Sequence, residues 1–129
     1  LMSEEKEQIA LCTYIRLQYL GIIFSSDHSG IRVGQGLANK VKLLHSENGI
    51  PDLTIYEPRG GFYGLCIEMK ATGKSPFRIT GMLRDSEHLR KQWKMLMRLE
   101  INGYCAGFCT GFEEAKDVVD WYLSLPKTD

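Results

Sequence analysis

The sequence has no long hydrophobic run and no excess of charge of either sign. Its apolar stretches are far shorter than the roughly 20 residues that a membrane-spanning helix needs. Residues 1–5 (LMSEE) lack the basic and apolar regions of a signal peptide. These absences lead us to expect a cytoplasmic protein that makes no contact with a membrane.

Cysteine is scarce, and its spacing argues against a zinc site. The cysteines Cys12, Cys66, Cys105 and Cys109 form no CxxC pair, which zinc sites commonly use. Each lies in an apolar stretch. Reduced thiols are common core residues of cytosolic proteins, so we expect buried free thiols here.

Length and composition predict one domain over residues 1–129. The chain is 43% hydrophobic and 25% charged, which is the balance of an ordinary globular protein. A chain of this length suits a single hydrophobic core. We find no internal repeat, no low-complexity segment and no linker that would separate two domains.

The charges are balanced in number but not in position. Sixteen basic residues face 16 acidic ones, yet the stretch from Lys70 to Arg98 has eight basic residues against Asp85 and Glu87. The C-terminal segment 113–129 is instead acidic. A molecule with one basic side can grip a polyanion locally without being basic overall, although such helix faces are commonly only solvated.

Hydrophobic periodicity and turn residues predict the order αβαββαβα. Helices are expected over 3–20, 36–45, 85–101 and 111–125, and strands over 22–26, 52–57, 63–70 and 104–109. The segment 72–82 contains two glycines and a proline and is predicted to be a loop. Two neighbouring strands joined by a tight turn indicate an α/β fold, with a small mixed sheet flanked by helices on both faces.

The apolar residues at helical spacing give the predicted buried faces. They are Ile9, Cys12, Ile15 and Tyr19 in the first helix, Leu37, Val41 and Leu44 in the second, Leu89, Trp93, Leu96 and Met97 or Leu99 in the third, and Val118, Trp121, Tyr122 and Leu125 in the fourth. Trp93 and Trp121 are thus expected to be core residues.

One group of polar residues is predicted to meet at the edge of the sheet. Asp52 begins one strand and Glu68 lies near the end of the next. Because these strands form a hairpin, the start of the first lies beside the end of the second. Glu68 and Lys70 are two residues apart on a strand, so they project from the same face.

Two carboxylates and an ammonium are the groups that phosphodiester cleavage needs. Carboxylates hold Mg²⁺, which stabilises the charge that develops on a phosphate. A lysine can orient the attacking water or offset charge in the transition state. The acidic start of the first helix, with Glu4, Glu5 and Glu7, offers a third carboxylate.

Each of these motifs also has a simpler interpretation when it is taken alone. A strand that ends in Glu-x-Lys can be a surface ion pair worth less than about 1 kcal/mol. A Pro-Asp pair often only begins a strand, and short motifs recur by chance. The occurrence of both motifs on neighbouring strands favours a functional site.

Beyond these motifs, nearly the whole sequence resembles the VRR-NUC domain, a branch of the PD-(D/E)xK nuclease superfamily. The central match is the pair of segments GIPD, ending at Asp52, and GGFYGLCIEMK, which contains Glu68 and Lys70. The other matching segments are Glu4-x-x-x-Gln8, Ser29-Gly30-Ile31-Arg32, Gln92-x-x-x-Leu96, Asn102-Gly103-Tyr104 and Gly111-Phe112-Glu113-Glu114-Ala115. The segment between Lys70 and Gln92 is longer than in short members of the family.

The resemblance implies a restriction-endonuclease-like αβββαβ core with an extra C-terminal helix. It also implies metal-dependent cleavage of branched DNA. Members that stand alone in bacteriophages and bacteria resemble homodimeric Holliday-junction resolvases. We accordingly expect an endonuclease of a bacterium or of a phage inside its host. It would use Mg²⁺, with Mn²⁺ as a substitute, and no nucleotide cofactor.

The resemblance also implies roles for individual residues. Asp52, Glu68 and Lys70 match the catalytic core, and Glu4 matches a metal carboxylate carried by a helix. Gln8 lies one helical turn further on the same face, and both Glu4 and Gln8 are expected to be catalytic residues. Metal ligands would be Asp52, Glu68 and Glu4, with Glu7 as the second choice for the helix-borne ligand. Expected contacts with DNA are Arg32, Lys74, Arg78 and Gln92.

Two other functions fit the same residues. One is a restriction-like or nicking nuclease with a different DNA substrate. The other is a protein that binds branched DNA without cutting it. The presence of both acidic positions together with Lys70 favours an enzyme over this non-catalytic alternative.

Overall fold

The structure is a computed structural model that describes residues 2–27 and 34–128. Arg32, an expected DNA contact, lies outside the described residues. Among the described residues, no helix combines the length and the apolarity that a membrane span requires.

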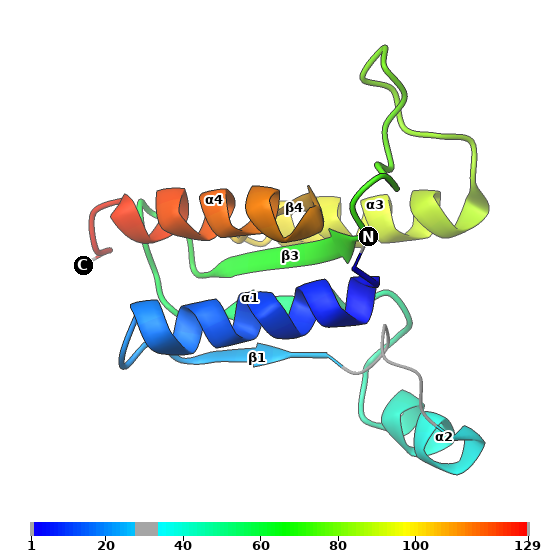
Figure 1. The fold of residues 1–129 in the computed structure, drawn as a ribbon, viewed down its shortest axis with the longest axis horizontal. Coiled ribbons are helices and arrows are strands. Elements are labelled where there is room, and N and C mark those ends of the chain that lie inside the picture. The colour runs from blue at the N-terminus through cyan, green and yellow to red at the C-terminus, as the bar shows by residue number, and fades with distance from the viewer. Residues whose placement is uncertain (1, 28–33, 129) are drawn as a thin grey trace.

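The order of elements is the predicted one (Figure 1). The helices are α1 (Glu4–Gln18), α2 (Gln35–Leu43), α3 (Glu87–Ile101) and α4 (Gly111–Ser124). The strands are β1 (Phe24–Ser26), β2 (Leu53–Ile55), β3 (Leu65–Lys70) and β4 (Cys105–Thr110). The first two strands are shorter than expected, and residues 71–86 form the predicted loop.

The sheet is mixed, as the sequence predicts. Its strand order is β1-β2-β3-β4, and β1 and β2 pair antiparallel, as do β2 and β3. Strands β3 and β4 are parallel, so the chain crosses over through α3 between them. In the hairpin Leu53 is opposite Ile67, which brings the preceding residue, Asp52, level with Glu68.

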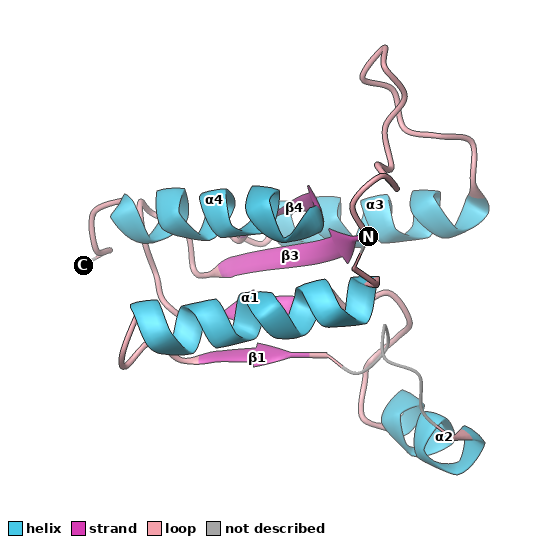
Figure 2. Ribbon diagram, viewed as in Figure 1, coloured by secondary structure: helices cyan, strands magenta, loops and turns pink. Residues whose placement is uncertain are grey.

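Two helices cover one face of the sheet and one helix covers the other (Figure 2). Helices α1 and α4 pack on one face, where Leu65, Ile67 and Met69 of β3 enter the hydrophobic core. Helix α3 packs on the other face, against β3 and β4. Side chains alternate along β3, so Glu68 points toward α3 and away from the hydrophobic core.

Helix α1 is shorter than the predicted helix 3–20, and its buried face includes the predicted residue Ile15 but is otherwise different. Ser3 is its N-cap and its hydroxyl accepts a hydrogen bond from the Lys6 amide at 3.2 Å. The predicted core residue Ile9 is 53% exposed, whereas Leu11 is fully buried. The prediction for Ile9 was wrong because the inward face also carries polar residues, Glu7 and Gln8, which an apolar pattern leaves out.

Helix α2 forms as predicted, but its apolar residues do not enter a core. None of its described residues is buried, and Leu37 is half exposed. Leu44, which follows the helix, is 80% exposed. The predicted inner face is therefore wrong, since no other element covers it in the described part of the chain.

Both tryptophans lie at the protein surface instead of in the core. Trp93 is 37% exposed and stacks on Phe108 of β4, with ring centroids 6.2 Å apart. Trp121 is 49% exposed, while its neighbour Tyr122 is fully buried and donates a hydrogen bond to the Glu57 carbonyl at 2.7 Å. The inward faces of α3 and α4 are therefore rotated from the predicted ones.

The cysteines are free thiols, as expected. Cys66 and Cys109 are buried, and Cys12 and Cys105 are partly buried.

Substitution of Ile9 and of Leu11 by alanine distinguishes the observed buried face of α1 from the predicted one. Leu11→Ala should lower the free energy of unfolding by about 2 to 5 kcal/mol, because it leaves a cavity in a closed core. Ile9→Ala should change it by less than about 0.5 kcal/mol, as is usual at an exposed position. Urea unfolding measures both, and an equal loss in the two variants would contradict the observed packing of α1.

Candidate active site

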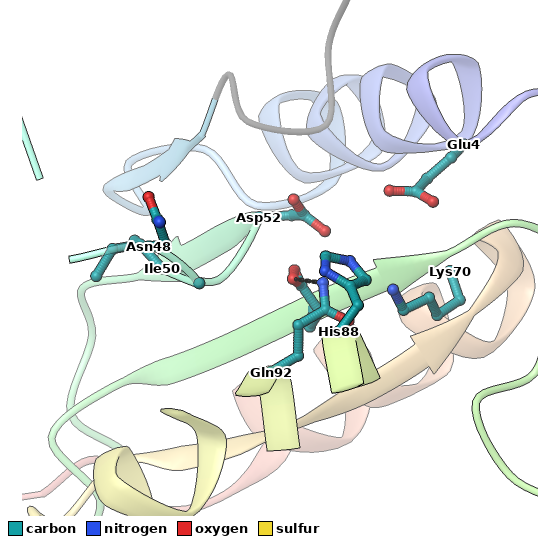
Figure 3. Close-up of a pocket in the computed structure, with 9 residues that line it drawn as sticks. Glu4, Asn48, Ile50, Asp52, Lys70, His88 and Gln92 are labelled. Atoms are coloured by element: carbon teal, nitrogen blue, oxygen red, sulfur yellow. Dashed lines mark hydrogen bonds between the residues drawn. The ribbon is translucent and has the colours of Figure 1, made fainter. Parts of the chain in front are cut away.

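A cavity of about 290 Å³ opens where β2 begins and β3 ends. Its lining residues are Glu4, Asn48, Gly49, Ile50, Asp52, Glu68, Lys70, His88 and Gln92. Figure 3 shows side chains from α1, α3 and the sheet around the same space. The structure therefore brings together five residues that the sequence singles out, which are Glu4, Asp52, Glu68, Lys70 and Gln92.

Local structure explains how each of these side chains reaches the cavity. Asp52 directly precedes β2, and the hairpin register places it opposite Glu68. Glu68 and Lys70 share a face of β3 because side chains alternate along a strand. Glu4 lies in the first turn of α1, whose start is fixed by the Ser3 cap.

The carboxylate of Asp52 is buried and held by the backbone of the neighbouring strand. The Met69 amide donates a hydrogen bond to its Oδ2 at 2.7 Å. Burial raises the pKa of Asp52, although hydrogen bonds from Glu68 and Met69 and the charge of Lys70 oppose that rise. Asp52 is therefore costly to ionise in the absence of a further cation.

Glu68 is buried against Asp52 and has one unsatisfied oxygen. Its Oε1 accepts a hydrogen bond from Gln92 Nε2 at 2.7 Å, while no described residue donates to its Oε2. Burial, followed by the hydrogen bond to Asp52 and its charge, places the pKa of Glu68 well above its usual range. Burial beside Asp52 thus favours the protonated form of Glu68 over the ionised form.

The two neighbouring carboxylates on the cavity wall suit a small divalent cation. A cation between Asp52 and Glu68 would neutralise both carboxylates and provide a partner for the unsatisfied Oε2. Within the described residues, no group of three or more His, Cys, Asp or Glu side chains is arranged to hold a metal ion. Mg²⁺ is commonly bound by one or two carboxylates and several waters, so this pair fits it.

The structure separates the two glutamates considered for the helix-borne ligand. Glu4 lines the cavity, and its pKa is raised by burial and by the charge of Asp52. Glu7 does not line the cavity and instead accepts hydrogen bonds from the Thr72 amide and hydroxyl and from the Phe112 amide. Burial would raise the pKa of Glu7, but these hydrogen bonds outweigh it and lower the pKa. Glu7 thus joins α1 to the ends of β3 and β4.

Gln8 lies behind the cavity and is not one of its lining residues. Its Nε2 donates to Ser26 Oγ at 2.6 Å, to the Asp27 carbonyl at 2.9 Å and to the Asp52 carbonyl at 3.4 Å. Ser26 Oγ in turn donates to the Asp52 carbonyl at 2.7 Å. Gln8 therefore supports the backbone of Asp52 and does not face the open space.

Lys70 and Gln92 both lie in the cavity, whereas Lys74 and Arg78 do not. The Lys70 ammonium lies 5.8 Å from the centroid of the Phe108 ring. Lys74 and Arg78 are exposed on the loop 71–86, outside the cavity. The structure therefore does not bring these two loop residues together with the carboxylates.

Sequence reasoning did not identify His88 and Asn48, which also line the cavity (Figure 3). His88 precedes Gln92 by four residues, so both side chains project from one face of α3. That spacing is the signal that could have identified His88. Asn48 lies in an irregular segment before β2, where no periodic pattern points to it.

Removing the charge of Glu68 should raise the free energy of unfolding by an amount that depends on pH. Glu68→Gln keeps the acceptor for Gln92 and supplies a permanent donor toward Asp52. Burial beside Asp52 raises the pKa of Glu68 in the folded protein above that in the unfolded chain, so the folded protein binds more protons. The stability of the wild-type protein therefore falls as the pH rises above the usual range of a glutamate pKa. We expect a gain of about 1 to 3 kcal/mol at pH 8 and little gain at pH 5.

Thermal unfolding at both pH values measures this gain. Glu100→Gln on the exposed surface of α3 is the matched control and should show no such difference. If stability depended on pH in the same way in the two variants, the claim that Asp52 and Glu68 destabilise each other would be contradicted.

Comparison with known proteins supports the fold. No family model matches the sequence, and no match is found among curated proteins. A solved structure described as "VRR_NUC domain protein" superposes with a TM-score of 0.69 at 24% sequence identity. The match covers 100% of this chain and 94% of that chain. The expected fold is thus confirmed: a mixed four-stranded sheet with four helices, as in a VRR-NUC domain protein.

Proposed function

We propose that residues 1–129 are a single nuclease domain that hydrolyses phosphodiester bonds in DNA with the help of Mg²⁺, for which Mn²⁺ can substitute. The observation that carries this proposal is the cavity in which Asp52, Glu68, Lys70 and Glu4 converge. The similarity of the fold to a VRR-NUC domain protein supports the same reaction class.

Asp52 and Glu68 are the proposed metal ligands, and Glu4 is the proposed third carboxylate. Bound there, Mg²⁺ would supply electrostatic stabilisation of the negative charge that develops on the phosphate. Gln92 keeps the Glu68 carboxylate oriented through its 2.7 Å hydrogen bond. Gln8 keeps the Asp52 backbone in place from behind.

Lys70 is the proposed catalytic partner of these carboxylates. It projects from the same face of β3 as Glu68, two residues further along the strand. Its ammonium can hold the attacking water in line with the scissile phosphate or stabilise charge on a phosphate oxygen. Hydrolysis by direct attack of this water would need no covalent intermediate with the protein.

We propose a four-way DNA junction as the preferred substrate and a homodimer as the active form. An isologous dimer presents two equivalent sites, so each protomer would cut one strand of a symmetric junction. The exposed leucines Leu37, Leu43 and Leu44 in and next to α2 support association, because they offer apolar surface for a partner to cover. Arg32, Lys74, Arg78 and Gln92 are proposed to contact the DNA.

Cleavage of defined DNA substrates tests this function. We expect faster cutting of a synthetic four-way junction than of a flap or a linear duplex of equal length in Mg²⁺. EDTA should abolish cutting, and added Mn²⁺ should restore it. Light scattering should give twice the 14.7 kDa mass of the chain.

The same assay separates the alternatives. Equal or faster cutting of linear duplex would indicate a restriction-like or nicking nuclease. Tight junction binding without cutting in either metal would indicate a non-catalytic binding protein and would overturn the proposed reaction.

Replacement of the proposed catalytic lysine should separate cutting from binding. Lys70→Ala removes the ammonium beside the reacting phosphate, so we expect the rate of junction cleavage to fall by about 100-fold or more. Junction affinity in EDTA should stay within a few-fold of wild type, because one contact among many is lost. Lys127→Ala, an exposed lysine near the C-terminus, is the matched control. A wild-type cleavage rate in Lys70→Ala would remove this residue from the mechanism.

A further inference from the structure

We propose that a second, basic groove binds the phosphate backbone of a DNA arm as it leaves the active-site cavity. The groove lies between α3 and the segment before β2 and has a volume of about 380 Å³. Its lining residues are Glu47, Asn48, Lys91, Lys94, Met95 and Arg98. The choice of DNA as its ligand rests on the proposed function.

Three cations of the groove form a row along one helix. Lys91, Lys94 and Arg98 are spaced by three and four residues, so they lie on one side of α3. Met95, which is buried, is the apolar residue beside them. Lys91 and Arg98 are seven residues apart, or about 10 Å along the helix axis. With about 3.4 Å of duplex axis per phosphate on one strand, the row matches about three phosphates.

The groove adjoins the active-site cavity. Asn48 lines both spaces, and α3 contributes His88 and Gln92 to the cavity and the basic row to the groove. A strand held at the carboxylate pair would therefore continue along α3 toward its C-terminal half. The groove lies on a different segment from Lys74 and Arg78, so it would hold a different stretch of DNA.

The acids near the row bind its cations only weakly. Arg98 contacts Glu47 at 2.6 Å and Lys91 contacts Glu87 at 3.4 Å, with all four side chains well exposed. Exposed pairs of this kind are worth about 0 to 1 kcal/mol, so a phosphate can replace the carboxylate. Among the described residues that line the groove, Glu47 is the only acid, and its negative charge lowers the affinity of the groove for phosphate.

Junction binding at several salt concentrations tests the groove. Measurements use fluorescence anisotropy with a labelled four-way junction in EDTA, and Lys70→Ala is the background so that no DNA is cut. Adding Lys91→Ala, Lys94→Ala and Arg98→Ala together should weaken binding by about 10-fold to 100-fold near physiological salt. It should also reduce the slope of log affinity against log salt by about 2 to 3, since each lost phosphate contact removes about 0.9.

A gain-of-affinity variant keeps the test independent of any loss of folding. Glu47→Gln releases Arg98 and removes a repulsive charge, so junction binding should tighten by roughly threefold at low salt. Lys127→Ala, added to the same background, is the control for loss of a lysine and should leave the slope unchanged. An unchanged slope in the triple variant, or unchanged affinity in Glu47→Gln, would overturn the proposal.

The outcome is distinguishable from failure of the proposed nuclease activity. Suppose that the protein with Lys70 intact does not cut the junction, but that the triple substitution reduces the slope of log affinity against log salt. The proposed DNA-binding groove is then supported, and the proposed nuclease activity is contradicted. Suppose instead that the protein with Lys70 intact cuts the junction, and that adding the triple substitution to it leaves the KM for the junction unchanged. The proposed nuclease activity is then supported, and the proposed groove is contradicted. If the groove is right, the triple variant should raise KM and leave kcat unchanged.

Discussion

Asp52 and Glu68 lie buried side by side at the open end of the hairpin, and the surrounding structure is arranged around their repulsion. Each carboxylate disfavours the ionised form of its neighbour, and burial raises the pKa of both. The Met69 amide and the Gln92 amide group each satisfy one oxygen of the pair. A pair of this kind lowers the stability of the protein, and such costs are commonly found at binding sites.

The polar residues of α1 hold the sheet ends that carry this pair. Gln8 and Ser26 both bond to the Asp52 carbonyl, while Glu7 bonds to Thr72 and Phe112 after β3 and β4. These side chains are buried and their partners are backbone groups or short hydroxyls. They explain why α1 presents a mixed polar and apolar face to the sheet. A helix that packed only through leucine would leave the Thr72 and Phe112 amides without the acceptors that Glu7 provides.

The geometry of the cavity was predictable where it depends on local rules. Alternation along β3 puts Glu68 and Lys70 on one face, and the hairpin, which turns at 59–62, brings Asp52 beside them. Residues whose position depends on long-range packing were not predictable in this way. The inward face of α1 includes polar groups, α2 lacks a covering element among the described residues, and Asn48 reaches the cavity from an irregular segment.

The parallel pairing of β3 and β4 has a consequence for how such a protein can diverge. A parallel pair needs a crossover connection, and here that connection contains both the exposed loop 71–86 and α3. Helix α3 is anchored on the sheet, so it keeps Gln92 at Glu68 whatever the length of the loop before it. Insertions in that loop can therefore change the surface beside the cavity while the hydrogen bond between Gln92 and Glu68 stays intact. One half of this connection is free to vary in length, and the other half is fixed by its packing on the sheet.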